Sequence, residues 1–237
     1  MKTWVIPDVH GCSATLKSLV ETLICPNQDD TIIFLGDYVD RGPDSKGVIE
    51  YVQHLSSVLA HVITLKGNHE DYIHKVIQEA KEPTLLMKMG FRGILCREWM
   101  FHGGNTFLSS YGVKRASELP EDICNWLENL QYYHIYKSFL IVHAGFNFSA
   151  ENIFEDSNAM LWVRDYTIDH EKLAGRRIIH GHVPMSLEFI HQSLENPDFG
   201  FIDLDNGVYM TDKPGYGNLM ALELNSMELL IQPNLDM

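Results

Sequence analysis

Charged and amide side chains follow five predicted strands at the points where those strands end. The first strand leads into "PDVHG", the second into "GDYVDRG" and the third into "GNHE", and two later strands lead into "HAG" and "HGH". The side chains that these strand ends supply are Asp8, His10, Asp37, Asn68, His143 and His182. Ligands of open α/β sheets gather at the carboxyl ends of the strands, so we expect these six side chains to share one rim.

The donor types at this rim indicate a metal centre. Oxygen and nitrogen donors without a thiolate suit manganese, iron or zinc better than calcium or magnesium. Six donors exceed the need of one tetrahedral zinc ion, so we expect two divalent ions. Such a pair can hold one hydroxide and bring its pKa towards about 7, which supplies a nucleophile near neutral pH. No side-chain nucleophile is then required.

Alternating strands and helices position the first three strand ends. Short apolar runs predict strands at residues 3–7, 31–36 and 61–67. Apolar residues at helical spacing predict a helix over 13–24 with Ser13 as its N-cap, a second over 44–55 capped by Asp44, and a third from about Glu70. This alternation is typical of right-handed parallel crossovers.

The second part of the chain changes character twice. Residues 83–130 are predicted to be mainly helical and less regular, with the clearest helix at 120–130. Short strands separated by turns are predicted at 132–138, 139–145, 177–182, 199–205, 218–224 and 227–232. We therefore expect an α/β fold in which two sheets lie between helices in a single domain.

Composition limits the partners and the location. The 237 residues carry a formal net charge of −14, which disfavours nucleic acid or an anionic membrane as the main partner. The amino terminus has four apolar residues before its first proline, too few for a signal peptide, and no apolar run approaches a membrane span. The four cysteines lack CxxC spacing, so we expect reduced thiols in a cytoplasmic protein.

The motifs "PDVHG … GDYVDRG … GNHE … HAG … HGHVP" resemble, in order and spacing, those of the metal-dependent phosphoprotein phosphatase family within the metallophosphoesterase superfamily. The resemblance covers residues 1 to about 185, and "HGGNTFLSSYG" and "LWVRD" are similar to segments of its small bacterial and phage-like members. Pro7 stands where the family usually has glycine, but this change removes no ligand. The resemblance implies one calcineurin-like metallophosphoesterase domain over residues 1–237, with a mainly helical insertion at about 83–130.

The resemblance also implies a set of metal ligands. Asp8 and His10 would hold the first ion, and Asp37 would bridge both ions. The second ion would be held by Asn68, His143 and His182. We expect two Mn²⁺ ions, with iron or zinc as the alternatives. For the last ligand His180 is a rival, and we favour His182 because it precedes "VP" as the family's ligand does.

A second group of residues is implied to handle the substrate. His69 would be the general acid, oriented by Asp40, whose charge favours the protonated imidazole. Arg41 and Arg164 would bind phosphate oxygens together with Asn68, because the planar guanidinium binds two oxygens at once. Arg176 and Arg177 are rivals of Arg164, and Glu70 is expected only to begin a helix.

The resemblance implies a hydrolase that acts on a phosphoprotein or a phosphorylated small molecule. We expect a serine/threonine protein phosphatase; a dinucleoside polyphosphate (diadenosine tetraphosphate) hydrolase is the alternative. A catalytically silent phospho-binding scaffold is disfavoured, because all six ligands and His69 are present. The dinucleotide alternative needs basic and aromatic residues around the site, and the candidates are Lys81, Lys88, Arg92, Arg97, Trp99, His102, Lys114 and Arg115.

Overall fold

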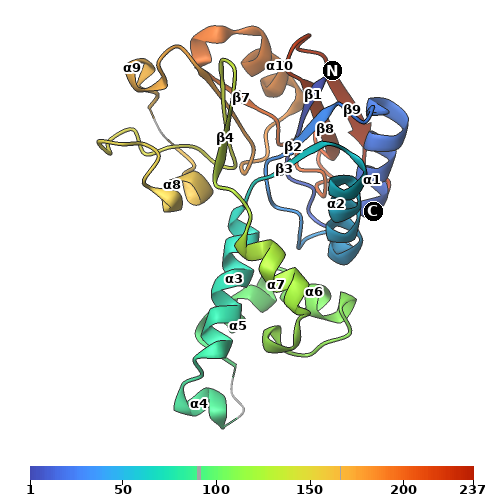
Figure 1. Cartoon of the computed structure of the whole chain (residues 1–237), viewed down its shortest axis with the longest axis vertical. Coiled ribbons are helices and arrows are strands. Elements are labelled where there is room, and N and C mark those ends of the chain that lie inside the picture. The colour runs from blue at the N-terminus through green and yellow to red at the C-terminus, as the bar shows by residue number, and fades with distance from the viewer. Residues whose placement is uncertain (90–91, 166) are drawn as a thin grey trace.

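Two β-sheets form the centre of the molecule (Figure 1). The computed structural model describes residues 1–89, 92–165 and 167–237. One sheet has the strand order β3-β2-β1-β8-β9, formed by His61–Thr64, Thr31–Phe34, Thr3–Ile6, Asn218–Glu223 and Leu229–Pro233. The other has the order β4-β5-β6-β7, formed by Tyr133–Tyr136, Phe139–Val142, Arg177–His180 and Phe201–Asp203. Strands β1, β2 and β3 are mutually parallel, as are β5, β6 and β7.

The core between the sheets is built from alternate residues of the strands. Val5, Ile33 and Leu222 of the first sheet belong to one buried cluster with Ile141 and Ile179 of the second. The intervening residues of the first sheet point the other way, because successive strand side chains alternate between faces. These residues, among them Trp4, Ile6, Ile32 and Phe34, pack with the apolar faces of the helices. The predicted two-sheet arrangement between helices is therefore confirmed.

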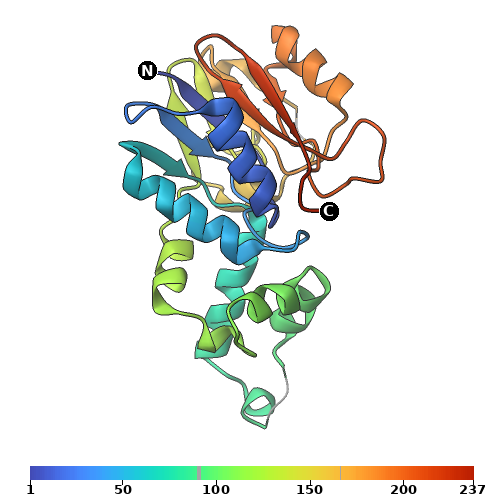
Figure 2. The same cartoon turned by 90° about the vertical axis from the view of Figure 1, so that its right-hand side faces the viewer.

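Helices cover the outer face of each sheet (Figures 1 and 2). Helix α1 (Ser13–Ser18), which continues as a π-helix over Leu19–Ile24, and α2 (Ser45–Val58) lie beside the first sheet. The second sheet is accompanied by α8 (Ser157–Trp162), α9 (His170–Leu173) and α10 (Leu187–Glu195). In the described part of the chain, no helix has the length and apolar character needed to cross a bilayer.

The predicted cap of α2 is confirmed and that of α1 is wrong. The Asp44 carboxylate accepts a hydrogen bond of 2.8 Å from the Gly47 amide at the start of α2. Ser13 does not cap α1, because its hydroxyl donates to the same Asp44 carboxylate at 2.6 Å, and Cys12 occupies the N-cap position. The Ser13 hydroxyl thus links the start of α1 to the N-cap of α2.

A group of helices over residues 68–130, here called the helical segment, projects away from the sheets (Figures 1 and 2). It comprises α3 (Asn68–Lys81), α4 (Leu85–Lys88), α5 (Ile94–Phe101), α6 (Gly104–Ser110), a 3₁₀ turn (Ala116–Glu118) and α7 (Glu121–Glu128). Helix α3 begins at Asn68, two residues before the expected start. Buried Ile73, Trp99, Phe107 and Leu127 hold these helices together.

Candidate metal centre

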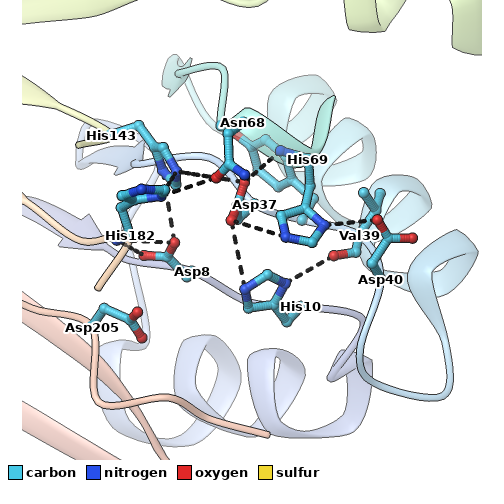
Figure 3. A network of polar contacts seen from close by, with 12 residues as sticks. Asp8, His10, Asp37, Val39, Asp40, Asn68, His69, His143, His182 and Asp205 are labelled. Carbon is cyan, nitrogen blue, oxygen red and sulfur yellow. Dashed lines mark hydrogen bonds and ion pairs between the residues drawn. The ribbon is translucent and has the colours of Figure 1, made fainter. Parts of the chain in front are cut away.

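The carboxyl ends of strands from both sheets meet at one rim (Figure 3). Within the first sheet, the amides of Val9 and His10 donate to the carbonyl of Asp37 at 3.0 and 2.8 Å, which ties the loop after β1 to the loop after β2. Between the sheets, the amide of His182 donates to both carboxylate oxygens of Asp8 at 3.2 Å. The structure thus brings together all six side chains that the strand ends were expected to supply.

Two of the histidines are oriented by backbone carbonyls. His10 Nδ1 lies 2.9 Å from the carbonyl oxygen of Val39, and His143 Nδ1 lies 3.1 Å from that of Leu35. A carbonyl at one ring nitrogen fixes the tautomer in which the other nitrogen carries a lone pair. Both histidines therefore turn an Nε2 acceptor towards the centre of the rim.

Asp37 lies between the two groups of donors. Its Oδ2 is 3.6 Å from His10 Nε2 and 3.9 Å from His69 Nε2. Its Oδ1 is 3.6 Å from His143 Nε2. The two carboxylate oxygens face opposite groups, which is the placement expected of a bridging ligand.

The donor atoms of the second group, Asn68, His143 and His182, lie closer together than those of the first. Asn68 Oδ1 lies 3.0 Å from both His143 Nε2 and His182 Nδ1, and those two nitrogens are 3.1 Å apart. The Asp8 carboxylate also lies on this side, with Oδ1 at 3.7 Å from His143 Nδ1. His180 takes no part, because its ring packs against Phe201 at a centroid distance of 5.2 Å.

His69 is held by Asp40 at the edge of the rim. Its Nδ1 lies 2.7 Å from Asp40 Oδ2, which leaves Nε2 directed towards Asp37 (Figure 3). Burial lowers the pKa of His69 to about 3, with a further lowering by the Arg41 charge, and burial raises the pKa of Asp40 to about 7. Burial therefore opposes the charged pair that was expected from the sequence, and a negative charge supplied by substrate is needed to favour it.

The backbone of the rim is strained. Five non-glycine residues of the site have positive φ angles, and they are His10 (46°), Asp37 (51°), Asp40 (66°), Arg41 (65°) and His182 (73°). Each such residue costs roughly 1–3 kcal/mol and persists only where the surrounding structure enforces it. Strain of this kind is typical of functional sites, because it aims side chains that a relaxed turn would direct elsewhere.

Interlocked loops enforce this strain. Gly36 has a φ of +106°, and a Cβ there would lie 2.3 Å from the Gly67 nitrogen. Across this contact, the buried carboxylate of Glu70 accepts hydrogen bonds from the amides of Asp37, Tyr38 and Gly67 at 2.8, 2.9 and 3.0 Å. Glu70 therefore joins the loops after β2 and β3, in addition to beginning α3. This role of Glu70 was not predicted, since its partners are backbone amides, which no residue type in the sequence reveals.

Burial makes the donor set costly without a cation. The pKa values of Asp8 and Asp37 are raised well above the usual range by burial and by neighbouring carboxylates. Burial and the surrounding histidines lower the pKa values of His10 and His143. Neutral imidazoles are the form that binds metal, and divalent cations would offset the repulsion between the carboxylates.

The residues present fit two divalent ions. One potential ligand group consists of His10, Asp37 and His69, the other of Asp37, His143 and His182, and in each the ligand atoms lie within 4.8 Å of one another. The buried His182 Nε2 has no hydrogen-bond partner among the residues that the structure describes. The shared Asp37 agrees with its expected bridging position. The first group also includes His69, which was expected to be the general acid, because its ring nitrogen lies within 4.8 Å of the ligand atoms of His10 and Asp37.

Two further residues at the rim were not predicted. Asp205 follows β7 and lies beside Asp8 (Figure 3), where its charge contributes to the raised pKa of Asp8. Tyr209 packs edge-on against His10 at 5.0 Å between ring centroids, with the Arg41 guanidinium 5.5 Å from its own ring centre. The signal for Asp205 is the one used for the other strand ends, because "FIDLD" is a strand followed by an acid.

A cavity of about 310 Å³ opens beside His69. The residues that line it include the cations Arg41 and Arg164 and the aromatic rings of Tyr72, Trp99, His102 and Trp162. Arg177, a rival of Arg164 in the sequence, instead donates to backbone carbonyls such as that of Phe201 at 3.2 Å. The structure therefore places both expected arginines at the same opening.

The sequence model of the calcineurin-like phosphoesterase family matches residues 1–211. The chain belongs to the calcineurin-like phosphoesterase family. It is a metallophosphoesterase, as its motifs predicted, and members of this family use a dinuclear divalent metal centre. The donors gathered at the rim are consistent with such a centre.

Curated relatives share part of this sequence. The symmetrical bis(5'-nucleosyl)-tetraphosphatase of Pectobacterium carotovorum is 40% identical over 70 residues, which cover 30% of this chain and 24% of that protein. The protein of the same name from Proteus mirabilis is 41% identical over 70 residues, with the same coverage. The matched segment thus spans about a quarter of these relatives.

Solved structures of the family share the fold. A protein assigned as a diadenosine tetraphosphatase superposes with a TM-score of 0.61 and 17% identity, covering 100% of this chain and 95% of its own. A serine/threonine phosphatase from Saccharomyces cerevisiae gives a TM-score of 0.64 at 15% identity, with 98% and 79% coverage. A cold-active protein-tyrosine phosphatase from a Shewanella species gives 0.62 at 16%, with 98% and 80% coverage. At these identities the likeness concerns the fold alone.

Proposed function

We propose that this metallophosphoesterase hydrolyses dinucleoside polyphosphates, and that a dinucleoside tetraphosphate is cleaved symmetrically. The observation that carries the proposal is a pair of adjoining cavities that share Arg41 and His102. One is the 310 Å³ cavity beside His69, and the other has a volume of about 660 Å³. A dinucleoside polyphosphate carries a nucleoside at each end, so it can fill both cavities. A single phosphorylated side chain would fill only one.

Each cavity offers an aromatic surface to a base. Trp162 and Tyr72 line the first, with ring centroids 6.4 Å apart. Phe101 lines the second and is 88% exposed, although it is a large apolar side chain. Stacking on such a ring contributes roughly 1–3 kcal/mol per base. An exposed phenylalanine beside an arginine therefore supports a ligand with both an aromatic ring and phosphate charge.

The residues of the chain suggest how such a substrate is held and cleaved. Arg41 and Arg164 bind the inner phosphates, since guanidinium groups form paired hydrogen bonds to phosphate oxygens. The oxygen of water bonds to one inner phosphorus as the bridging P–O bond breaks. The bridging oxygen leaves with the other half and takes a proton from His69 Nε2. The proton released by the attacking water restores the protonated imidazole, and the products are two nucleoside diphosphates.

Asp40 keeps His69 ready for this transfer by holding Nδ1 at 2.7 Å. The negative substrate favours the protonated imidazole, against the lowering of its pKa by burial. The two divalent ions that Asp8, His10, Asp37, Asn68, His143 and His182 would hold supply Lewis-acid stabilisation of phosphate charge and an acidic water. Mn²⁺ remains our expectation for both ions. The relatives named bis(5'-nucleosyl)-tetraphosphatase add support for the substrate class.

The test compares kcat/KM for diadenosine tetraphosphate and for a phosphothreonine peptide, each with added Mn²⁺. We expect the dinucleotide to be preferred at least 100-fold, with ADP as the sole nucleotide product. Phe101→Ala and Trp162→Ala should each raise KM for the dinucleotide about 5- to 150-fold, as the loss of one stacked base predicts. Leu86→Ala is the matched control, because Leu86 is 62% exposed in the same helical segment.

The opposite preference would contradict the proposal. Serine/threonine phosphatase activity, which the motifs favour, stays a prediction, and the phosphothreonine peptide measures it directly. A peptide preference with no effect of Phe101→Ala would assign the site to phosphoproteins. Detection of AMP and ATP as products would contradict only the symmetrical cleavage, and the substrate class would stand.

A further inference from the structure

A third cavity, in the helical segment, is lined by several cations although the protein as a whole is acidic. Its volume is about 470 Å³, and it lies against α3, α5 and the 3₁₀ turn before α7. The four cationic residues that line it are Lys88, Arg92, Lys114 and Arg115. The chain as a whole carries a net charge of −14 from 18 basic and 32 acidic residues. The local charge of this cavity is therefore opposite to that of the molecule.

The carboxylate in this cavity is already engaged. Glu79 accepts hydrogen bonds from the amides of Leu95 and Cys96 at 3.3 and 3.2 Å, at the start of α5. It also fills the space that a Cβ on Gly93 would occupy, 2.0 Å from Glu79 Oε2. Across the described ranges 1–89, 92–165 and 167–237, no ion pair joins a carboxylate to any of the four cations. Their charge is left for an external anion.

The cavity also has an apolar side. Val76 and Ala80 of α3 line it together with Pro83 and Met87. Four cations alone would suit any polyanion, including a nucleic acid or an anionic membrane. A cavity lined by both cations and apolar groups fits a small molecule that joins phosphates to a less polar body.

This cavity is separate from the site beside His69. The two share no lining residue in the part of the chain that the structure describes. They lie towards opposite ends of α3, since His69 and Tyr72 line one and Val76 and Glu79 the other. Ten residues of α-helix separate His69 from Glu79, which corresponds to about 15 Å. Four of the basic residues expected near the metals, Lys88, Arg92, Lys114 and Arg115, thus line this separate cavity.

We propose that this basic cavity is a second phosphate-binding site, which binds a small oligophosphate anion outside the catalytic centre. Arg92 and Arg115 bind phosphate oxygens through their guanidinium groups, and Lys88 and Lys114 add charge. The ligand is an inorganic oligophosphate or a nucleoside di- or triphosphate. The apolar wall at Pro83 and Met87 is where a nucleoside would lie.

The test uses the full-length protein freed of metal with EDTA, so that it does not depend on hydrolysis. Isothermal titration calorimetry measures binding of inorganic tripolyphosphate to the Arg41→Gln/Arg164→Gln variant, which lacks the arginines of the catalytic cavity. We expect one tripolyphosphate per chain. Adding Arg92→Gln and Arg115→Gln should weaken this binding at least 10-fold. Arg97→Gln is the matched control, because Arg97 is an exposed cation on α5 that lines neither cavity.

Pyrophosphate and ADP distinguish the two ligand sources. Tighter binding of ADP, lost in Met87→Gln, identifies a nucleotide site, and equal or tighter binding of pyrophosphate identifies an inorganic oligophosphate site. Loss of all tripolyphosphate binding in Arg41→Gln/Arg164→Gln would overturn the proposal. The same holds if Arg92→Gln/Arg115→Gln binds as tightly as its parent, or if the cations bind only anionic phospholipid vesicles. None of these outcomes alters the preference for diadenosine tetraphosphate, which is measured separately with Mn²⁺.

Discussion

The rim of the metal centre and the helical segment position functional side chains in opposite ways. At the rim, His10, Asp37 and His143 are buried and fixed by backbone bonds between neighbouring loops. In the helical segment, Phe101 at the end of α5 and the loop residues Arg92 and Arg115 are exposed at the surface. Metal chemistry requires donors fixed in place, so its residues belong to strand ends; selecting a substrate or effector requires only a surface, which helices can supply.

The contrast extends to stability. Strained φ angles and buried carboxylates at the rim cost free energy, which the interlocked loops and a bound cation offset. The distal part of the helical segment instead exposes large apolar side chains, among them Leu85, Leu86, Met89 and Ile94. Mutations should therefore affect catalysis and metal binding at the rim, and affinity for ligands in the helical segment.

Replacing the bridging carboxylate should have the largest effect. We expect Asp37→Asn to lower kcat/KM about 10³-fold, because several kcal/mol of charge stabilisation are lost with the shared ligand. Metal content, measured by inductively coupled plasma mass spectrometry, should fall with it. Asp71→Asn is the control: Asp71 is a buried acid on α3 that pairs with Lys75 at 2.6 Å, outside the rim. A fully metallated and active Asp37→Asn enzyme would refute the bridging assignment.

Removal of the acid should have the next largest effect and should leave the metals in place. His69→Asn should lower kcat/KM about 10²- to 10³-fold, the usual contribution of a general acid. Asp40→Asn should cause a smaller loss, since it disturbs only the orientation of His69 through Nδ1. If His69→Asn also loses one ion per chain, His69 is a ligand of the group it forms with His10 and Asp37, and its assignment as acid is wrong.

The sequence predicts the rim better than the helical segment for a physical reason. A strand end fixes where its side chains go, so Asp8, Asp37 and His143 could be placed at one rim because each directly follows a predicted strand. The choice of His182 over His180 agrees with the geometry, since His182 Nδ1 lies 3.0 Å from Asn68 Oδ1 whereas the ring of His180 packs against Phe201. Tyr209 could not be foreseen, because the loop after β7 returns to the rim through tertiary packing.

For the helical segment, the types of the functional residues could be predicted, but their arrangement could not. Trp99 and His102 line the catalytic cavity, as the dinucleotide alternative requires, whereas Lys88 and Lys114 line the basic cavity. The division depends on how α4, α5 and α6 turn back across α3. Short helices with short connections allow many such paths, and no periodicity in the sequence selects one.

The smallest effect is expected when one glycine of the rim and one of the helical segment are each replaced by alanine, and it concerns the free energy of unfolding. Gly36 and Gly112 both have positive φ, at +106° and +68°, but only Gly36 faces another backbone, whereas nothing lies within 4 Å of a Cβ on Gly112. Gly112→Ala should therefore cost only about 1 kcal/mol of left-handed strain. Gly36→Ala should cost about 2–3 kcal/mol, because the loop after β3 must also move. Urea denaturation of the metal-free proteins measures both free energies of unfolding. Equal losses would mean that the loops of the rim yield as readily as an open turn, and the rigidity attributed to the interlocked loops would have to come from the bound ions instead.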